Sequence, residues 1–327
     1  MGTEGFEPSI LAAHDSESCA YTNSATCPCK DNTLYDNIVP LGRLAQLVER
    51  LIYTEDVRGS SPLPPTRQAR GKPPMIDLSK NILYEDENIL VLNKPAGLIV
   101  HPDGRIVEPS VSEWFAKTYP DSKDVGESIK KTSGELIERA GVVHRIDRET
   151  SGVLLLAKTK RGYAVLKEQF QKREIEKIYH LFIYGNMKDD YGTINLPIGR
   201  SVSNFKKRSA QRGARGEMRE AITYFQVLKR VSDPPSHKAS EGQSKSVTFM
   251  EAKPKTGRTH QIRVHFKALH HPIVCDKLYA PNKPCLLGFT RLALHSRAIT
   301  FKTVNDKKVI IEAPYPEDFK QALNMLN

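Results

Sequence analysis

Short apolar segments of strand length recur along this chain, and they constrain the fold more than any other feature. Their β-branched and aromatic content and their turn-forming borders predict strands. Helical periodicity is clearest at residues 111–118, where Trp114 and Phe115 are expected to be buried, and at residues 162–172. Strands and helices do not alternate regularly, so we predict an α+β fold with a mixed, largely antiparallel central sheet flanked by helices. The predicted strands are residues 82–84, 89–92, 153–157, 177–184, 222–228, 247–252, 293–301 and 309–312.

A charged cluster at residues 144–152 runs directly into the apolar segment 153–157. This order is typical of a polar loop that feeds a buried strand. Within the loop, Asp147 lies between Arg145 and Arg148, and neighbouring cations favour the ionised carboxylate that a nucleophile or base requires. The alternative is a solvated turn with a local salt bridge. These residues alone do not choose between the two.

Residues 253–265 form a second polar segment, in which Gly257 provides a turn before a helix-like pattern. Thr259 is placed to cap that helix, with Ile262 and Phe266 pointing inward. Arg263 is adjacent to these apolar positions and is expected to be partly buried, so it needs an anion. The neighbouring histidines have no carboxylate or cysteine at ligand spacing, and no metal site is predicted.

The positive charge is confined to one part of the chain. Residues 1–74 contain 7 Lys and Arg against 9 Asp and Glu, whereas residues 75–327 contain the other 42 and 29, a net charge of +13. Such an excess favours a polyanionic partner, most often nucleic acid, over a merely basic enzyme. The segment 204–219 is predicted to be a loop that either follows a phosphate backbone or is simply solvated. Its basic residues are Lys206, Lys207, Arg208, Arg212, Arg215 and Arg219.

Residues 1–74 lack globular patterning and end in a linker rich in Ser, Pro and Gly. Segments such as 44–50 and 58–62 look like the conceptual translation of a transfer-RNA gene. We therefore expect a disordered or spurious extension, a true start at Met75, and one catalytic domain over residues 75–327. Peptides from upstream of Met75 in mass spectra of the native protein would contradict this.

The cellular compartment is predicted from the absence of membrane-spanning and signal-peptide patterns in the sequence. No apolar run approaches the length of about 18 residues that a membrane span needs, and no signal-peptide pattern is present. We expect a cytoplasmic protein without a membrane partner. The cysteines match no common zinc spacing, and all are predicted to be free thiols. They are Cys19, Cys27, Cys29, Cys275 and Cys285.

Three motifs in order resemble the RluA-like family of pseudouridine synthases, the branch that acts on large-subunit ribosomal RNA. The first is residues 91–98 with His101 and Pro102, the second residues 144–147 with 150–152, and the third residues 256–265 with 271–273. The resemblance covers residues 81–314. It implies the pseudouridine synthase fold, activity on ribosomal or transfer RNA as a monomer, and no metal or organic cofactor.

The resemblance also implies residue roles. Asp147 matches the catalytic aspartate, Tyr179 the tyrosine that packs against the target base, and Arg263 the basic partner of the aspartate. Arg145 matches the residue that enters the RNA where the uridine is flipped out. His144 and Arg258, from the second and third motifs, are expected to contact RNA. This sequence departs from the family at Cys275, where a glycine usually precedes Asp276, and at Ile146, where leucine is commoner.

Two other functions are compatible with parts of the pattern. An RNA chaperone without catalysis would use the same basic surface, but it has no reason to retain Asp147, Tyr179 and Arg263 together. A sugar hydrolase using Asp147 and Glu149 fails on geometry, because residues two apart on one turn rarely flank a bond as an acid and base pair. We therefore predict an RNA pseudouridine synthase.

Overall fold

The computed structural model describes residues 76–102, 108–130, 136–137, 139–202, 204, 207–211, 214–231 and 246–326. The predicted extension over residues 1–74, the cysteines within it, and the basic residues Lys206 and Arg212 lie outside the described residues. Among the helices of the described residues, none is both long enough and apolar enough to cross a membrane.

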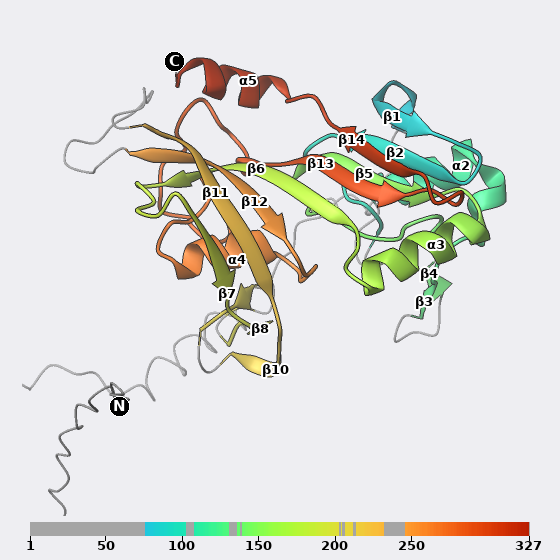
Figure 1. Ribbon diagram of the computed structural model, residues 1–327, viewed down its shortest axis with the longest axis horizontal. Coiled ribbons are helices and arrows are strands. Elements are labelled where there is room, and N and C mark those ends of the chain that lie inside the picture. The colour runs from blue at the N-terminus through green and yellow to red at the C-terminus, as the bar shows by residue number, and fades with distance from the viewer. Residues whose placement is uncertain are drawn as a thin grey trace, which may run out of the picture. The chain divides into compact units, whose positions relative to one another are not determined.

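A nine-stranded sheet forms the centre of the protein (Figure 1). Every strand pair in it is antiparallel except β13 with β5, which confirms the predicted mixed, largely antiparallel sheet. β14 pairs with β13 beside the main path. The strands in spatial order are β1 (Ile82–Glu85), β2 (Ile89–Lys94), β5 (Ser151–Ala157), β13 (Leu294–Lys302), β6 (Glu176–Tyr184), β12 (Val247–Pro254), β11 (Ile222–Val231) and β7 (Tyr191–Asn195), with β14 at Lys308–Glu312.

Four α-helices accompany the sheet: α2 (Val111–Thr118), α3 (Lys160–Gln171), α4 (Gln261–Ala268) and α5 (Glu317–Asn324). Both helices predicted from periodicity are present, and each begins at a side-chain cap. The Ser110 hydroxyl accepts from the Glu113 N–H while the Glu113 carboxylate accepts from the Ser110 N–H, which is a capping box at α2. The Thr159 hydroxyl accepts from the Gly162 N–H at α3. Two 3-10 turns, η1 (Ser79–Asn81) and η2 (Pro120–Ser122), are the other helical elements among the described residues.

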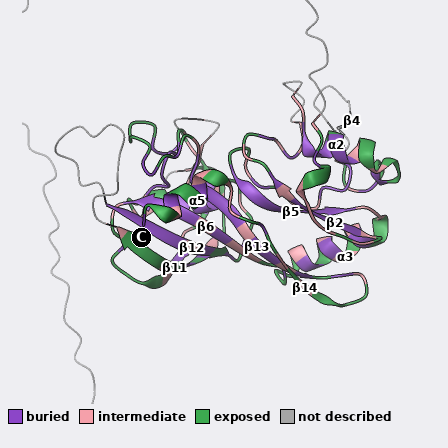
Figure 2. Ribbon diagram, turned by 90° about the horizontal axis from the view of Figure 1, so that it is seen from above, coloured by how far each residue is buried: buried purple, intermediate pink, exposed green. Residues whose placement is uncertain are grey.

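The central strand β5 is buried on both faces, as its continuous apolar sequence predicts. All seven of its residues are buried (Figure 2). Leu154 and Leu156 pack into one hydrophobic cluster, while Val153 and Leu155 pack into another on the opposite face. A strand fixed from both sides gives a rigid support to the polar loop that precedes it.

The basic segment 204–219 is not simply a loop, which corrects the sequence prediction. Arg208 and Ser209 form β9, and Arg215–Arg219 forms β10. Both pair with β8 (Ile198–Arg200) in a separate three-stranded sheet. These short strands bury little of their surface, so their sequences lack the apolar pattern from which a strand is predicted. A third, two-stranded sheet joins β3 (Ile129–Lys130) to β4 (Leu136–Ile137).

Candidate active site

A cleft of about 510 Å³ opens where the charged segments predicted from the sequence converge. Its volume is in the range of ordinary ligand sites. The lining comes from residues 143–147 and Thr150, from the end of α3 through β6, from residues 254–263, and from Leu294. The structure brings six of the predicted site residues together, because all of them line the cleft: Asp147, Tyr179, Arg263, Arg145, His144 and Arg258.

Hydrogen bonds from Lys94 anchor the loop that carries Asp147. The Lys94 ammonium is fully buried and donates to the carbonyls of Pro95 and Leu98 at 2.8 Å and of Arg148 at 3.0 Å. Burial lowers its pKa to about 7, while the nearby Asp147 and Glu149 charges act in the opposite direction. The first sequence motif therefore positions the second.

Two further contacts fix the loop where it joins β5. The His144 Nε2 atom accepts a hydrogen bond from the Leu155 N–H at 3.0 Å, and burial lowers the pKa of His144 to about 3. At Gly152, which has a φ of 105°, a Cβ atom would lie 2.1 Å from the Ser296 carbonyl oxygen. Only glycine permits this approach of β5 to β13. These contacts fix the position of the Asp147 loop relative to β5 and β13.

Arg263 is shared by two carboxylates. Its NH1 atom lies 3.0 Å from Asp147 Oδ2, while its Nε and NH2 atoms donate to the two Asp276 oxygens at 2.8 Å each. Asp276 is 1% exposed and also accepts from the Leu278 and Tyr279 N–H groups at 3.0 Å. Burial acts to lower the pKa of Arg263, but Asp276 and then Asp147 outweigh it, and the pKa is raised. The guanidinium is therefore charged and fixed beside Asp147.

The helix that carries Arg263 starts differently from the prediction. His260, not Thr259, is the N-cap residue of α4, with a left-handed φ of 57° and no side-chain cap. The Gln261 amide replaces the cap by accepting from Thr256 Oγ1 and the Arg258 N–H while donating to the Ile222 carbonyl. The His260 ring is therefore not needed as a cap, and it lines the cleft.

His260 lines the cleft beside Asp147, and Tyr279, outside the lining, contacts both His260 and Arg263. The His260 Nε2 atom lies 4.0 Å from Asp147 Oδ1, and its Nδ1 atom is 2.9 Å from the Tyr279 hydroxyl. The Tyr279 ring lies 5.0 Å from the Arg263 guanidinium carbon. Burial lowers the pKa of His260 despite the opposing charge of Asp147, so the ring is neutral at pH 7.

Tyr179 presents its ring to the cleft from β6. It is 9% exposed, and burial raises its pKa to about 12, with Asp147 adding to the increase and a hydrogen bond from Ser296 opposing it. The phenol is therefore protonated at neutral pH. It supplies a planar surface and a hydroxyl group near the carboxylate.

The predicted RNA-binding residues separate into two groups. Arg145 is exposed at the cleft, and Arg258 donates from Nε to the Glu220 carbonyl at 2.9 Å. Lys207, Arg208 and Arg215 do not line the cleft. The backbone N–H of Arg208 donates to the Tyr279 hydroxyl at 2.9 Å, which connects the basic segment to a residue that contacts the site.

Sequence reasoning assigned no site role to Asp276, Tyr279 or Lys177. Lys177 carried a usable signal, because it is two residues before Tyr179 on a strand and therefore shares its face. Asp276 carried none, since its role depends on the spatial return of the chain to Arg263.

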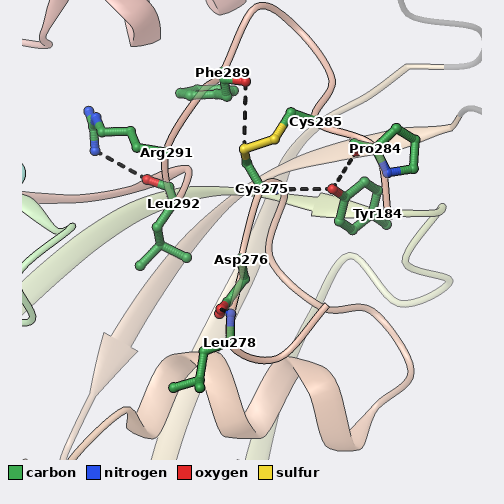
Figure 3. The surroundings of a disulfide bond; sticks show 9 residues. All are labelled: Tyr184, Cys275, Asp276, Leu278, Pro284, Cys285, Phe289, Arg291 and Leu292. Carbon is green, nitrogen blue, oxygen red and sulfur yellow. Dashed lines mark hydrogen bonds between the residues drawn. A yellow bond between two sulfur atoms is a disulfide. The ribbon is translucent and has the colours of Figure 1, made fainter. Parts of the chain in front are cut away.

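A disulfide joins Cys275 to Cys285, so the prediction that all cysteines are free thiols is wrong for this pair (Figure 3). The Tyr184 hydroxyl accepts from the Cys275 N–H at 3.0 Å and donates to the Pro284 carbonyl at 2.6 Å. One side chain thereby brings both ends of the loop together, with Cα atoms 4.6 Å apart. Cys275 has a φ of 58°, so the left-handed conformation is kept without the usual glycine.

Comparisons with known proteins agree on one family. A family model described as RNA pseudouridylate synthase matches residues 88–268. A dual-specificity RNA pseudouridine synthase RluA from Vibrio parahaemolyticus is 35% identical over 230 residues, which are 70% of this chain and 80% of that protein. A ribosomal large subunit pseudouridine synthase D from Xanthomonas campestris is 32% identical over 267 residues, 76% of this chain and 70% of that protein.

The fold is shared with solved structures. The human RNA pseudouridylate synthase domain containing 4 superposes with a TM-score of 0.55 at 24% identity, covering 76% of this chain and 94% of that one. The human RNA pseudouridylate synthase domain containing 1 gives a TM-score of 0.53 at 23% identity, covering 72% and 83%. At this identity the likeness establishes the fold.

Proposed function

Because the chain belongs to the RNA pseudouridylate synthase family, we propose that Asp147 is its catalytic residue and that Tyr179 and Arg263 complete the site. The protein is an isomerase that converts uridine in RNA to pseudouridine. The single observation that carries the residue assignment is the ion pair of 3.0 Å between Asp147 and Arg263 in a cleft that Tyr179 also lines.

The reaction rearranges one nucleotide without adding atoms. The N1–C1′ bond breaks, the uracil turns, and a C5–C1′ bond forms; the proton that leaves C5 is balanced by one gained at N1. The Asp147 carboxylate suits this task as a nucleophile or as a base toward the ribose. Tyr179 stacks against the uracil and assists the proton transfer, and Arg263 keeps the carboxylate oriented.

The uridine must leave its stack before Asp147 can reach it. Extruding a base costs a few kcal/mol, which contacts to phosphates and a stacking surface offset. In this proposal Arg145, which is exposed at the cleft two residues before Asp147, occupies the gap that the base leaves. His144 acts in this proposal by fixing the loop, because its ring nitrogen is engaged with Leu155.

The substrate is ribosomal RNA of the large subunit or transfer RNA. The similarity to a ribosomal large subunit pseudouridine synthase supports the first, and the similarity to a dual-specificity RNA pseudouridine synthase is compatible with more than one RNA substrate. We further propose that the enzyme works as a monomer in the cytoplasm and that Lys207, Arg208 and Arg215 contact RNA outside the cleft.

The test is to map pseudouridine in total RNA from a strain lacking this gene before and after incubation with the enzyme. Wild-type protein should create a new pseudouridine, and Asp147→Asn should create none while melting at the wild-type temperature. Asp306→Asn, at an exposed position outside the cleft, is the matched control and should remain active. A fully active Asp147→Asn variant would refute the assignment, and RNA binding without product in the wild type would favour the chaperone alternative.

A further inference from the structure

Four cations gather along one side of the cleft, and none of them belongs to the Asp147 ion pair. They are Arg173, Lys177, Lys255 and Arg258, which we call the Lys177 cluster. Arg173 follows α3, Lys177 lies on β6, and Lys255 and Arg258 follow β12. Among the residues that line the cleft, Asp147 is the single carboxylate, and Arg263 already pairs with it. The cluster is therefore a concentration of positive charge without a matching anion in the lining.

Lys177 is the member with the greatest need of a partner. Its side chain is half-buried, and within the described part of the chain its ammonium makes no hydrogen bond or ion pair. Its recorded neighbour is the Phe170 ring, 5.9 Å from Nζ. Burial, with the charge of Lys255 acting in the same direction, lowers the pKa of Lys177 to about 8. A partly desolvated cation beside a second cation is costly unless an anion joins them.

The other members are only partly neutralised. Arg173 pairs with the exposed Glu220 carboxylate at 2.6 Å, and Arg258 donates to the Glu220 carbonyl rather than to its carboxylate. The Lys255 ammonium is 3.4 Å from the Arg173 carbonyl and has no ion pair among the described residues. Glu220, which lies outside the lining, thus contacts Arg173 and Arg258, and Lys255 has no carboxylate partner among the described residues.

Strand geometry relates Lys177 to the place of the target base. Lys177 and Tyr179 are two residues apart on β6, so they lie on one face about 7 Å apart along the strand. On β13, Ser296 pairs with Tyr179 and Ile299 with Lys177, while Gly152, just after the Asp147 loop, also pairs with Ser296. Lys177 therefore lies farther than Tyr179 from the junction of that loop with β5. A nucleotide with its base on Tyr179 and its sugar near Asp147 has its phosphodiester chain within reach of Lys177.

We propose that Lys177, together with Lys255 and Arg173, binds a backbone phosphate of the RNA next to the target uridine. A phosphodiester supplies the charge that the cluster lacks, whereas a uracil carbonyl is neutral and would leave several adjacent cations unbalanced. The inference rests on the proposed function for the identity of the bound strand, and on the described side chains for the anion site itself.

Binding measurements test the site without requiring turnover. The affinity of the full chain for a labelled 20-nucleotide stem-loop RNA with a uridine-rich loop is measured against salt concentration. Log affinity falls as log salt rises, and each lost phosphate contact makes this negative slope shallower by about 0.7 to 1. Lys177→Met should make the slope shallower by that amount, and Lys177→Arg should restore the wild-type slope. Lys320→Met, which removes an exposed charge on α5, is the matched control and should leave the slope unchanged.

Thermal melting separates a binding role from a structural one. Lys177→Met should melt at or above the wild-type temperature, because it replaces an unpaired, partly buried charge with an apolar chain of similar length. A lower melting temperature would mean that the ammonium supports the fold, and would overturn the proposal. A salt slope equal to that of the Lys320→Met control would overturn it as well.

A modified RNA identifies the ligand atom. In the RNA fragment that the wild type converts, a methylphosphonate replaces one phosphate flanking the target uridine and removes its charge. Wild-type affinity should fall about as far as Lys177→Met lowers it, and the combined change should add nothing further. Additive losses at both flanking positions would refute a phosphate contact. Absence of product with wild-type enzyme, alongside the expected salt slopes, would refute the proposed function and leave the anion site standing.

Discussion

Replacing Asp276 with asparagine removes one of the two negative charges that face Arg263 and changes the shape of the side chain very little. The Asp276 oxygens accept four hydrogen bonds, two from Arg263 and one each from the Leu278 and Tyr279 N–H groups. An asparagine retains one acceptor oxygen. Its NH₂ group must then face a donor, either on Arg263 or on the backbone. The substitution therefore loses a charge and also introduces a buried clash between donors.

The size of the effect follows from burial. Arg263 is 8% exposed and Asp276 1%, so solvent compensates for almost none of the loss. Breaking a buried ion pair by removing one partner costs about 3–5 kcal/mol. Asp147 remains as a second anion for Arg263, which puts the expected cost near 3 kcal/mol. For a domain of this length, that lowers the melting temperature by roughly 6–12 °C.

Circular dichroism of the full chain provides the assay. Asp276→Asn should melt well below the wild type, whereas Asp306→Asn, which removes a carboxylate paired with Lys302 at the exposed surface, should not change the melting temperature. An Asp276→Asn variant within 2 °C of the wild type would refute the reasoning that Asp276 is the anion which makes a buried Arg263 tolerable.

A double variant separates stability from catalysis. Arg263→Met in the Asp276→Asn background removes both partners, so it should recover stability relative to the single variant. It should nevertheless remain inactive, because Asp147 has lost its oriented partner. Recovery of activity along with stability would mean that Arg263 only supports the fold.

Three further predictions concern the framework. Cys285→Ser removes the disulfide to Cys275, which joins residues separated by 10 positions in the sequence. The substitution should lower the free energy of unfolding, measured by chemical denaturation, by about 3 kcal/mol under oxidising conditions and should leave it unchanged under reducing ones. Gly152→Ala should unfold the protein or abolish activity, because its Cβ would lie 2.1 Å from the Ser296 carbonyl oxygen; a stable, active variant would contradict this. Burial lowers the pKa of His295 to about 4, so the unfolded chain takes up a proton below pH 6.5 that the folded chain refuses. The stability that the neutral ring contributes above pH 6.5 is therefore lost as the pH falls toward 4, by up to about 1.4 kcal/mol per pH unit. His295→Gln should reduce this dependence of the unfolding free energy on pH, whereas His270→Gln, at the exposed surface, is the control and should not.

Local pattern made most of the sheet predictable. β5 could be recognised because an apolar segment without alternation must be buried on both faces. β6 could be recognised because its sequence, rich in aromatic and β-branched residues, fits a strand whose side chains point alternately to two faces. The order of the strands could not be recognised. β5 lies between β2 and β13, and the latter begins at Leu294, more than 130 residues later in the chain. That placement is decided by packing across the whole domain and leaves no trace in a local window.

The same distinction explains the site. Asp147 and Arg263 could be singled out, because each contradicts its surroundings: a carboxylate among arginines and a cation among apolar residues. Asp276 and the partnership of Cys275 with Cys285 could not, because both depend on how residues 275–285 fold back on themselves. The left-handed φ at Cys275 and the bridging hydroxyl of Tyr184 determine that path, and neither is visible without coordinates.

The charges of the cleft give it a direction. Asp147, Arg263 and Asp276 together carry one net negative charge, because a single guanidinium serves two carboxylates. The Lys177 cluster on the far side of Tyr179 carries an excess of positive charge. A nucleotide is itself polar in this sense, with an anionic phosphate and an anomeric carbon that becomes electron-poor as its bond to the base breaks. Only one orientation puts the phosphate against the cations and C1′ against the carboxylate. Reversing it would bring two anions together, so the arrangement that stabilises the reacting carbon also selects the direction in which the RNA strand crosses the site.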